Sequence, residues 1–113
     1  MVVHEASDVE IDRIFQALAD ATRRDIIRRV MRTEQSVSTL AGNYQMSFAA
    51  VQKHIAVLER ASLVVKQRRG REQIVQGNPE ALHRVASLLE AYGDIWRQRA
   101  ERIEDILSES PKE

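Results

Sequence analysis

Polar side chains gather on one face of the segment 47–60, SFAAVQKHIAVLER. Its apolar residues recur at intervals of four and three, which is the spacing of one buried helix face. They are Val51, Ile55 and Leu58. Near the start of this helix, Gln52 can form two hydrogen bonds with adenine, Ala49 can touch a thymine methyl group, and Lys53 suits a phosphate. These side chains suit a helix that reads base edges in a DNA groove, and the elements around the segment decide whether it does so.

Ser47 and His54 are the only nucleophile and base that lie near each other in this segment. No carboxylate is placed to orient the histidine, as a catalytic triad requires. The chain also has no cysteine, no glycine-rich phosphate loop and no cluster of metal ligands. We therefore predict no enzyme activity, no cofactor and no metal site. Ser47 is expected to cap the helix, to contact a phosphate, or both; His54 fits a phosphate contact and a structural hydrogen bond equally well.

A second basic feature follows at about 63–76. Strand-forming residues lie on both sides of KQRRGREQ, and Gly70 allows the positive φ that a tight hairpin needs. The tip would expose three arginines, a residue type that suits the negative potential of a narrow minor groove. The segment predicts a two-stranded wing, although a basic hairpin without a partner would have the same pattern.

The elements that must position these residues begin near the N-terminus. Ser7 and Glu10 form a capping-box pair at the start of a helix over about 8–19. Asp20 can cap a second helix, which carries five arginines on its exposed faces. Most of these arginines are expected to be solvated, and some to meet phosphates or acidic partners.

The stretch from about 38 to 61 has the organisation of a helix-turn-helix. Ser38 is expected to cap its first helix. Nine residues separate Ala41 from Val51, enough for one helix to end and another to begin at a steep angle. On spacing alone, a short helical hairpin that binds no ligand is an alternative, and the wing directly after it favours the helix-turn-helix.

A long helix is predicted over about 79–108. Pro79 suits its first turn, and its apolar seam is too long for a small domain to cover by itself. The helix of a second copy is the simplest cover. The alternative is a helix that folds back as two shorter ones at Gly93, since glycine in a helix interior costs about 1 kcal/mol.

The 113 residues are enough for one domain, 1–113, with one modest core. The net charge is zero, but lysine and arginine are concentrated in the middle and acidic residues towards both ends. A basic centre is typical of a nucleic-acid binder and is also compatible with chance segregation on a solvated surface. The sequence has no signal-peptide pattern and no apolar run near 20 residues, so we expect no membrane association and a cytoplasmic protein.

Taken together, these segments resemble the ArsR family of bacterial winged helix-turn-helix repressors over roughly residues 10 to 107. The most specific stretches are ALADATRRDII from Ala17, VQKHIAVLERASLV from Val51, and RRGR from Arg68. The resemblance implies a homodimer that binds double-stranded DNA at a pseudo-palindromic operator and usually represses transcription. It also implies that a ligand or metal can release the DNA.

The chain departs from the family pattern at several positions. Ala21 stands where proline is common, and Gln45 where many members have glycine. Ser36-Val37-Ser38-Thr39-Leu40 falls where metal-sensing members carry Cys-Val-Cys-Asp-Leu, and two hydroxyls cannot replace two soft thiolates. The last helix has only His83 of the other family metal site. Metal sensing is therefore not expected, and the sequence is compatible with a small-molecule effector of unidentified nature.

The sequence thus predicts a mainly α fold with a small two-stranded β-wing, a winged helix-turn-helix of about five helices with a long C-terminal dimerisation helix. The alternative function is a winged-helix module whose basic face binds an acidic protein partner. The residues predicted to contact DNA are Ser47, Phe48, Ala49, Gln52, Lys53, His54, Arg68, Arg69 and Arg71. The residues predicted to line the dimer interface are Leu82, Val85, Leu89, Tyr92, Trp96, Ile103 and Leu107.

Overall fold

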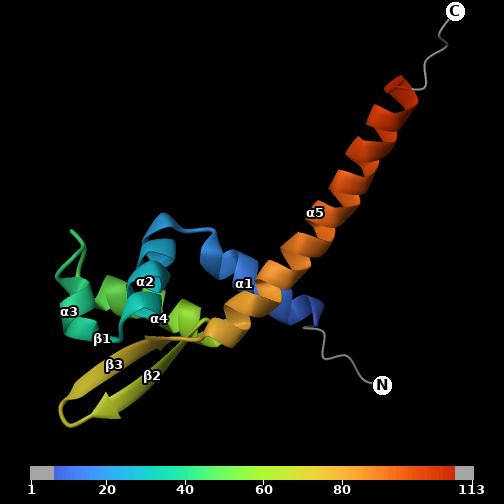
Figure 1. The fold of residues 1–113 in the computed structure, drawn as a ribbon. Coiled ribbons are helices and arrows are strands. Elements are labelled where there is room, and N and C mark those ends of the chain that lie inside the picture. Colours follow the sequence, from blue (N-terminus) through green and yellow to red (C-terminus); the bar gives the residue numbers. More distant parts are fainter. Residues whose placement is uncertain (1–6, 109–113) are drawn as a thin grey trace, which may run out of the picture.

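The structure is a computed structural model that describes residues 7–108 (Figure 1). Over this range the chain forms five helices and three short strands. They are, in order, α1 (Asp8–Leu18), α2 (Ala21–Arg32), β1 (Gln35–Ser36), α3 (Val37–Ala41), α4 (Phe48–Arg60), β2 (Val64–Arg69), β3 (Glu72–Gly77) and α5 (Pro79–Ser108). The predicted winged helix-turn-helix is confirmed.

Hydrogen bonds from side chains fix the starts of α1 and α2. The capping box of α1 is confirmed, because the Glu10 amide donates to Ser7 Oγ at 3.2 Å and the Ser7 amide donates to Glu10 Oε1 at 3.1 Å. Asp20 caps α2 by accepting from the Arg23 amide at 3.0 Å, and this bond lowers the pKa of the Asp20 carboxyl. Both helices therefore begin where the sequence indicates.

Two of the arginines of α2 close the end of α1. The Arg23 guanidinium donates to the carbonyl oxygens of Ala17, at 2.7 Å, and Gln16, at 2.9 Å. Arg24 donates to the carbonyl oxygen of Leu18 at 2.7 Å. The last carbonyl groups of a helix have no partner within it, so these arginines join the two helices, Arg23 half-buried and Arg24 at the exposed surface.

Ser36, not Ser38, caps α3, so the predicted cap is wrong by two residues. Ser36 Oγ accepts from the Thr39 amide at 3.0 Å and donates to Thr39 Oγ1 at 2.9 Å, while Ser38 is exposed. Ser36 is 7% exposed because it also ends β1, which pairs with β3. One buried residue therefore belongs to the sheet and starts the helix-turn-helix.

The sheet has one strand more than predicted. Its order is β1-β3-β2, and both pairs are antiparallel, with Gln35 opposite Val75 and Val64 opposite Gly77. Gly70 has φ 62° at the tip of the β2–β3 hairpin, as the sequence indicates. Gly77 packs closely against α2, because a Cβ there would overlap the thioether of Met31 and force that side chain to shift.

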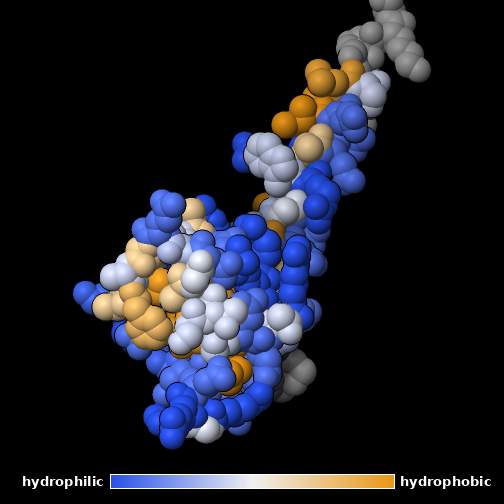
Figure 2. Space-filling model, turned by 90° about the vertical axis from the view of Figure 1, so that its left-hand side faces the viewer, coloured by the Kyte–Doolittle hydropathy of each residue, from blue (hydrophilic) through white to orange (hydrophobic). Residues whose placement is uncertain are grey.

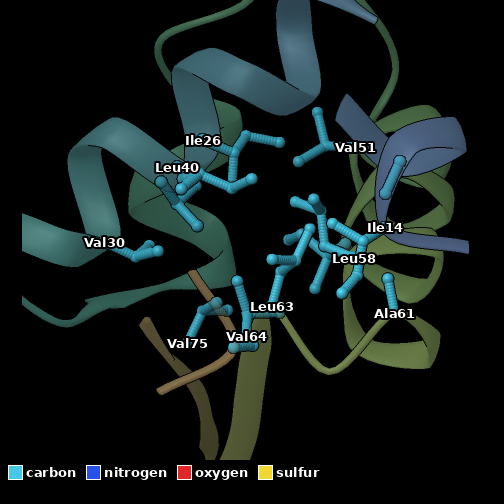
Figure 3. Packing of buried hydrophobic residues seen from close by; sticks show 14 of the residues in the cluster. Ile14, Ile26, Val30, Leu40, Val51, Leu58, Ala61, Leu63, Val64 and Val75 are labelled. Atoms are coloured by element: carbon cyan, nitrogen blue, oxygen red, sulfur yellow. The ribbon is translucent and has the colours of Figure 1, made fainter. Parts of the chain in front are cut away.

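The core lies where α1, α2, α3 and α4 meet the base of the wing (Figure 3). All three apolar residues predicted for the buried face of α4 are 0% exposed. The largest fully buried side chains are Ile26, Leu40, Ile55, Leu58, Leu63, Val51, Val64 and Val75. This packing fixes the angle of α4 against the rest of the domain.

α5 is a single helix of 30 residues, so the alternative of two helices divided at Gly93 is wrong. Only Ala81 and Val85 of α5 are buried, and beyond them the helix projects away from the domain (Figure 1). The Cα radius of gyration is 20.0 Å, whereas a compact chain of this length has about 13 Å. No helix within residues 7–108 is both long and apolar enough to cross a membrane.

Candidate nucleic-acid interface

The first two turns of α4 expose polar side chains. Ser47 Oγ caps the helix by accepting from the Ala50 amide at 3.1 Å, which confirms the predicted cap. Phe48 is 47% exposed, and Ala49, Gln52 and Lys53 are exposed as well. The side chains of Gln52 and Lys53 make no hydrogen bond or ion pair with any residue in the range 7–108, so their polar groups are available to an external partner.

His54 faces the body of the domain. Its Nδ1 lies 3.3 Å from Arg23 Nη1 and 3.8 Å from the Asp20 carboxylate. A guanidinium can only donate, so Nδ1 is the acceptor in the contact with Arg23. The structural hydrogen bond predicted as one of two roles for His54 is therefore present, and it joins α4 to the start of α2.

Ser47 and His54 have different partners. Ser47 Oγ is engaged with the α4 amide, and His54 Nδ1 with Arg23. The arrangement in which a base takes the proton of a nucleophile needs a hydrogen bond between the two side chains. The structure has no hydrogen bond between the Ser47 and His54 side chains. Each side chain instead stabilises the position of α4 through its own partner.

The three wing arginines differ in their surroundings. Arg68 Nε donates to the carbonyl oxygen of Gly70 at 3.2 Å. Arg69 forms a two-pronged ion pair with Glu34, a residue of the loop between α2 and β1. Arg71 is exposed, and its side chain makes no hydrogen bond or ion pair with the part of the chain that the structure describes. Arg71 is therefore the wing arginine with the most freedom to meet a phosphate or a groove.

Glu34 is a residue that the sequence did not single out. It accepts from both Arg69 and Gln76 Nε2, the latter at 2.8 Å. These hydrogen bonds, from Arg69 first, hold the pKa of the Glu34 carboxyl below its usual value, and the carboxylate raises that of Arg69. Glu34 thus links the wing to the body of the domain at an exposed site.

A second polar cluster ties α2 to the turn between α3 and α4. The Asp25 carboxylate accepts from Arg29 Nε at 2.8 Å and from the Tyr44 hydroxyl at 2.7 Å, and the Arg29 guanidinium lies 6.0 Å from the centre of the Tyr44 ring. The hydrogen bond from Arg29, then that from Tyr44, lowers the pKa of Asp25. Burial, followed by the bond to Asp25, raises the pKa of Tyr44 to about 12.

The apolar seam predicted for dimerisation divides into two parts. Val85 belongs to the core of the domain, and Leu82 packs half-buried against it. Beyond them the seam is exposed, and Figure 2 shows hydrophobic side chains along one side of α5 towards its C-terminal end. Its exposed apolar residues are Leu89, Tyr92, Ile95, Trp96, Ile103, Ile106 and Leu107, of which Ile95 and Ile106 were not predicted.

The side chains at the family's metal positions do not fit a metal. Ser36 Oγ is committed to Thr39, and a hydroxyl is a poor substitute for a thiolate. Within residues 7–108 no group of three or more His, Cys, Asp or Glu side chains is close enough together to hold a metal ion.

The chain is similar to known transcriptional regulators. No protein-family model matches it. It is 39% identical over 71 residues to the HTH-type transcriptional regulator Rv2034 of Mycobacterium tuberculosis, a match that spans 63% of this chain and 66%, just under two thirds, of that protein.

Solved structures match the chain over more of its length. The crystal structure of the ArsR family transcriptional regulator RHA00566 aligns with a TM-score of 0.76 at 30% identity, over 82% of this chain and 96% of that one. An ArsR-like transcriptional regulator from Rhodococcus sp. RHA1 aligns with a TM-score of 0.74 at 34% identity, over 87% and 92%. Fold, sequence and the arrangement of α3, α4 and the wing agree: this chain belongs to the ArsR family of transcriptional regulators.

Proposed function

We propose that the chain is a homodimeric transcriptional repressor that binds a pseudo-palindromic operator, with α4 of each protomer in a major groove and the wing beside it. The observation that carries this proposal is the contrast between the two faces of α4. One face is fully buried in the core, while Gln52 and Lys53 are exposed on the other without partners in residues 7–108. A helix held this firmly can present a fixed set of side chains to base edges.

Within this proposal the exposed residues of α4 have distinct roles. Gln52 pairs with adenine N6 and N7, a contact that typically discriminates by about 1–3 kcal/mol. Ala49 and Phe48 supply apolar contact to base edges. Ser47 and the free amides of the first turn meet a phosphate, and Lys53 adds a cation.

The wing supplies contacts that depend less on sequence. Arg71 is exposed at its tip, and an arginine there suits a narrow minor groove or a backbone phosphate. Arg69 is already paired with Glu34, so its guanidinium is less available to DNA than that of Arg71. Arg71 is therefore the main wing contact in this proposal.

The exposed part of α5 supports the dimer. Leu82, Leu89, Trp96 and Ile103 recur every seven residues, the repeat of helices that pair side by side. Leu89 and Trp96 are 50% and 70% exposed in the single chain, which is costly for large apolar side chains. The matching surface of a second copy covers both.

The direct test is binding to the DNA upstream of the chain's own gene. Fluorescence anisotropy would compare that duplex with a shuffled duplex of equal length and composition at one fixed salt concentration. We expect at least about 10³-fold tighter binding to the specific site. Equal affinity for the two duplexes would refute a sequence-specific regulator. A reporter gene fused to the same upstream region would then separate repression, in which the chain lowers expression, from activation.

A further inference from the structure

A cleft of about 270 Å³ opens beside the C-terminal half of α2. It lies outside the proposed DNA-reading face of α4, and it is small for a drug-sized ligand. Its walls come from α2 and the extended segment that leads into β1. They are formed by Asp25, Arg28, Arg29, Arg32, Thr33 and Gln35.

The cleft has an excess of positive charge. Three guanidinium groups face a single carboxylate, that of Asp25, which lies 3.3 Å from Arg28 and 2.8 Å from Arg29. Arg32 has no ion-pair partner within residues 7–108. The C-terminal end of a helix carries only about half a negative charge, so the helix dipole does not neutralise the excess. Arginine forks, a hydroxyl and an amide are the groups that proteins use to bind oxyanions.

The cleft is separate from the ion pair of the wing. Successive residues of an extended segment point to opposite sides, and Thr33 has extended dihedral angles of φ −159° and ψ 140°. Thr33 and Gln35 line the cleft, whereas Glu34 between them binds Arg69. An anion in the cleft would therefore not compete with Glu34 for the wing.

The cleft is connected to the turn before α4. Asp25 accepts a hydrogen bond from the Tyr44 hydroxyl at 2.7 Å. Arg29 donates to Asp25 and also lies over the Tyr44 ring. An anion that draws Arg28 and Arg29 towards itself weakens their hold on Asp25. The position of Tyr44, and with it the turn between α3 and α4, would then change.

We propose that this cleft binds a small oxyanion of the phosphate class through Arg28, Arg29 and Arg32. The bound anion then changes, through Asp25 and Tyr44, the position of the turn between α3 and α4. The phosphate group belongs either to a free anion or to the DNA backbone, since both present the same chemistry. The binding step stands on the cleft alone, and only its effect on DNA binding rests on the proposed function.

The test is a titration of the full chain with inorganic phosphate at constant ionic strength, with chloride as the reference anion. NMR would follow the Nε–H signals of the arginines and the ring signals of Tyr44. We expect saturable shifts of the three cleft arginines and of Tyr44. Arg32→Gln should weaken phosphate binding about tenfold, the effect of losing one charge-assisted hydrogen bond, and Arg28→Gln provides a second, independent variant.

Arg97→Gln is the matched control, because it removes the same charge from an exposed site on α5, where Asp94 is its one ion-pair partner among residues 7–108. The affinity of the Arg97→Gln variant for phosphate should stay within about twofold of that of the parent chain, as expected for a surface site distant from the cleft. Absence of saturable shifts with phosphate, or equal titrations for Arg32→Gln and Arg97→Gln, would overturn the proposal.

Binding of a random-sequence duplex distinguishes the two sources of phosphate. If the DNA backbone occupies the cleft, Arg32→Gln weakens binding to any duplex and phosphate competes with DNA. If a free anion occupies it, Arg32→Gln leaves DNA binding unchanged without phosphate and removes the effect of added phosphate. Both outcomes support an oxyanion site. The NMR titration contains no DNA, so a chain that does not bind DNA can still show saturable shifts with phosphate. The oxyanion site and the DNA-binding function are therefore tested independently.

Discussion

Arg69 in the wing and Glu34 before β1 form a two-pronged ion pair across 35 positions of the chain. Gln76 of β3 donates to the same carboxylate. The pair is exposed, with 47% of the Arg69 side chain and 39% of the Glu34 side chain accessible to solvent. Exposed pairs are weak, so a DNA phosphate could replace Glu34 as the partner of Arg69.

Glu34→Gln should therefore strengthen binding to DNA of any sequence several-fold. It leaves Arg69 without a competing carboxylate, and one additional phosphate contact would steepen the dependence of log affinity on log salt by about 0.9. Anisotropy titrations of a random duplex at several salt concentrations measure both quantities. Glu90→Gln, the same charge change on α5, should have no such effect, and equal slopes for the two variants would show that Glu34 does not restrain Arg69.

Gln52→Ala should weaken operator binding by about 1–3 kcal/mol and abolish discrimination at one base pair. The reason is that this amide makes its two hydrogen bonds only with the correct base. Binding assays with operators substituted one base pair at a time would locate that position. A uniform loss at all positions would assign Gln52 to the DNA backbone instead.

Arg71→Ala should weaken binding to operator and random DNA alike. A phosphate or groove contact from the wing tip carries little sequence information, and its loss reduces the salt slope by about 1. The measurement is the same salt series on both duplexes. A variant that loses operator affinity alone would mean that Arg71 reads a base.

Trp96→Glu should convert the proposed dimer to a monomer. The side chain is 70% exposed in the single chain, and a carboxylate buried at the centre of a helix pair without a partner is strongly unfavourable. Sedimentation equilibrium at micromolar concentration gives the mass, and circular dichroism checks that the variant is folded. Glu90→Gln serves as the control on α5. A parent chain that sediments as a monomer would rule out the proposed dimer.

Tyr44→Phe should destabilise the protein by about 1.5 kcal/mol at neutral pH, since it removes a hydrogen bond to a charged group. Asp25 has a folded-state pKa below its ordinary value of 3.8, so its interactions contribute stability above that value. This contribution is lost as the pH falls through the lowered folded-state pKa. Urea unfolding at one protein concentration should therefore show the parent and Tyr44→Phe converging below about pH 4. A difference that stays constant down to pH 3 would mean that the Tyr44 bond does not depend on the Asp25 charge.

The sequence predicted the features that depend on neighbouring residues. The caps at Ser7, Asp20 and Ser47 and the buried face of α4 all follow from residue types within one or two helical turns. The cap of α3 was predicted at Ser38 instead of Ser36. The strand β1, which ends at Ser36, has only two residues, too few for the alternating pattern that identifies a strand. Strand pairing buries Ser36, and nothing local signals that pairing.

The remaining features depend on contacts between distant segments. Glu34 with Arg69, and Asp25 with Tyr44, are separated by 35 and 19 positions, and no local pattern joins such residues. Val85 was assigned to a dimer interface because periodicity identifies an apolar face without showing what covers it. In the structure the domain itself covers that residue.

Because α5 is uninterrupted, a small rotation of this helix moves the domain at its end by several ångströms. At 30 residues the helix is about 45 Å long. In a pair of rods that cross near their middle, the arm from the crossing point to a domain is about 22 Å, and a change of about 10° in the crossing angle would move the domain by about 4 Å. That displacement is close to the roughly 3.4 Å step between base pairs. The spacing of the two half-sites in the DNA would then be set by how two straight rods cross, far from any residue that touches a base.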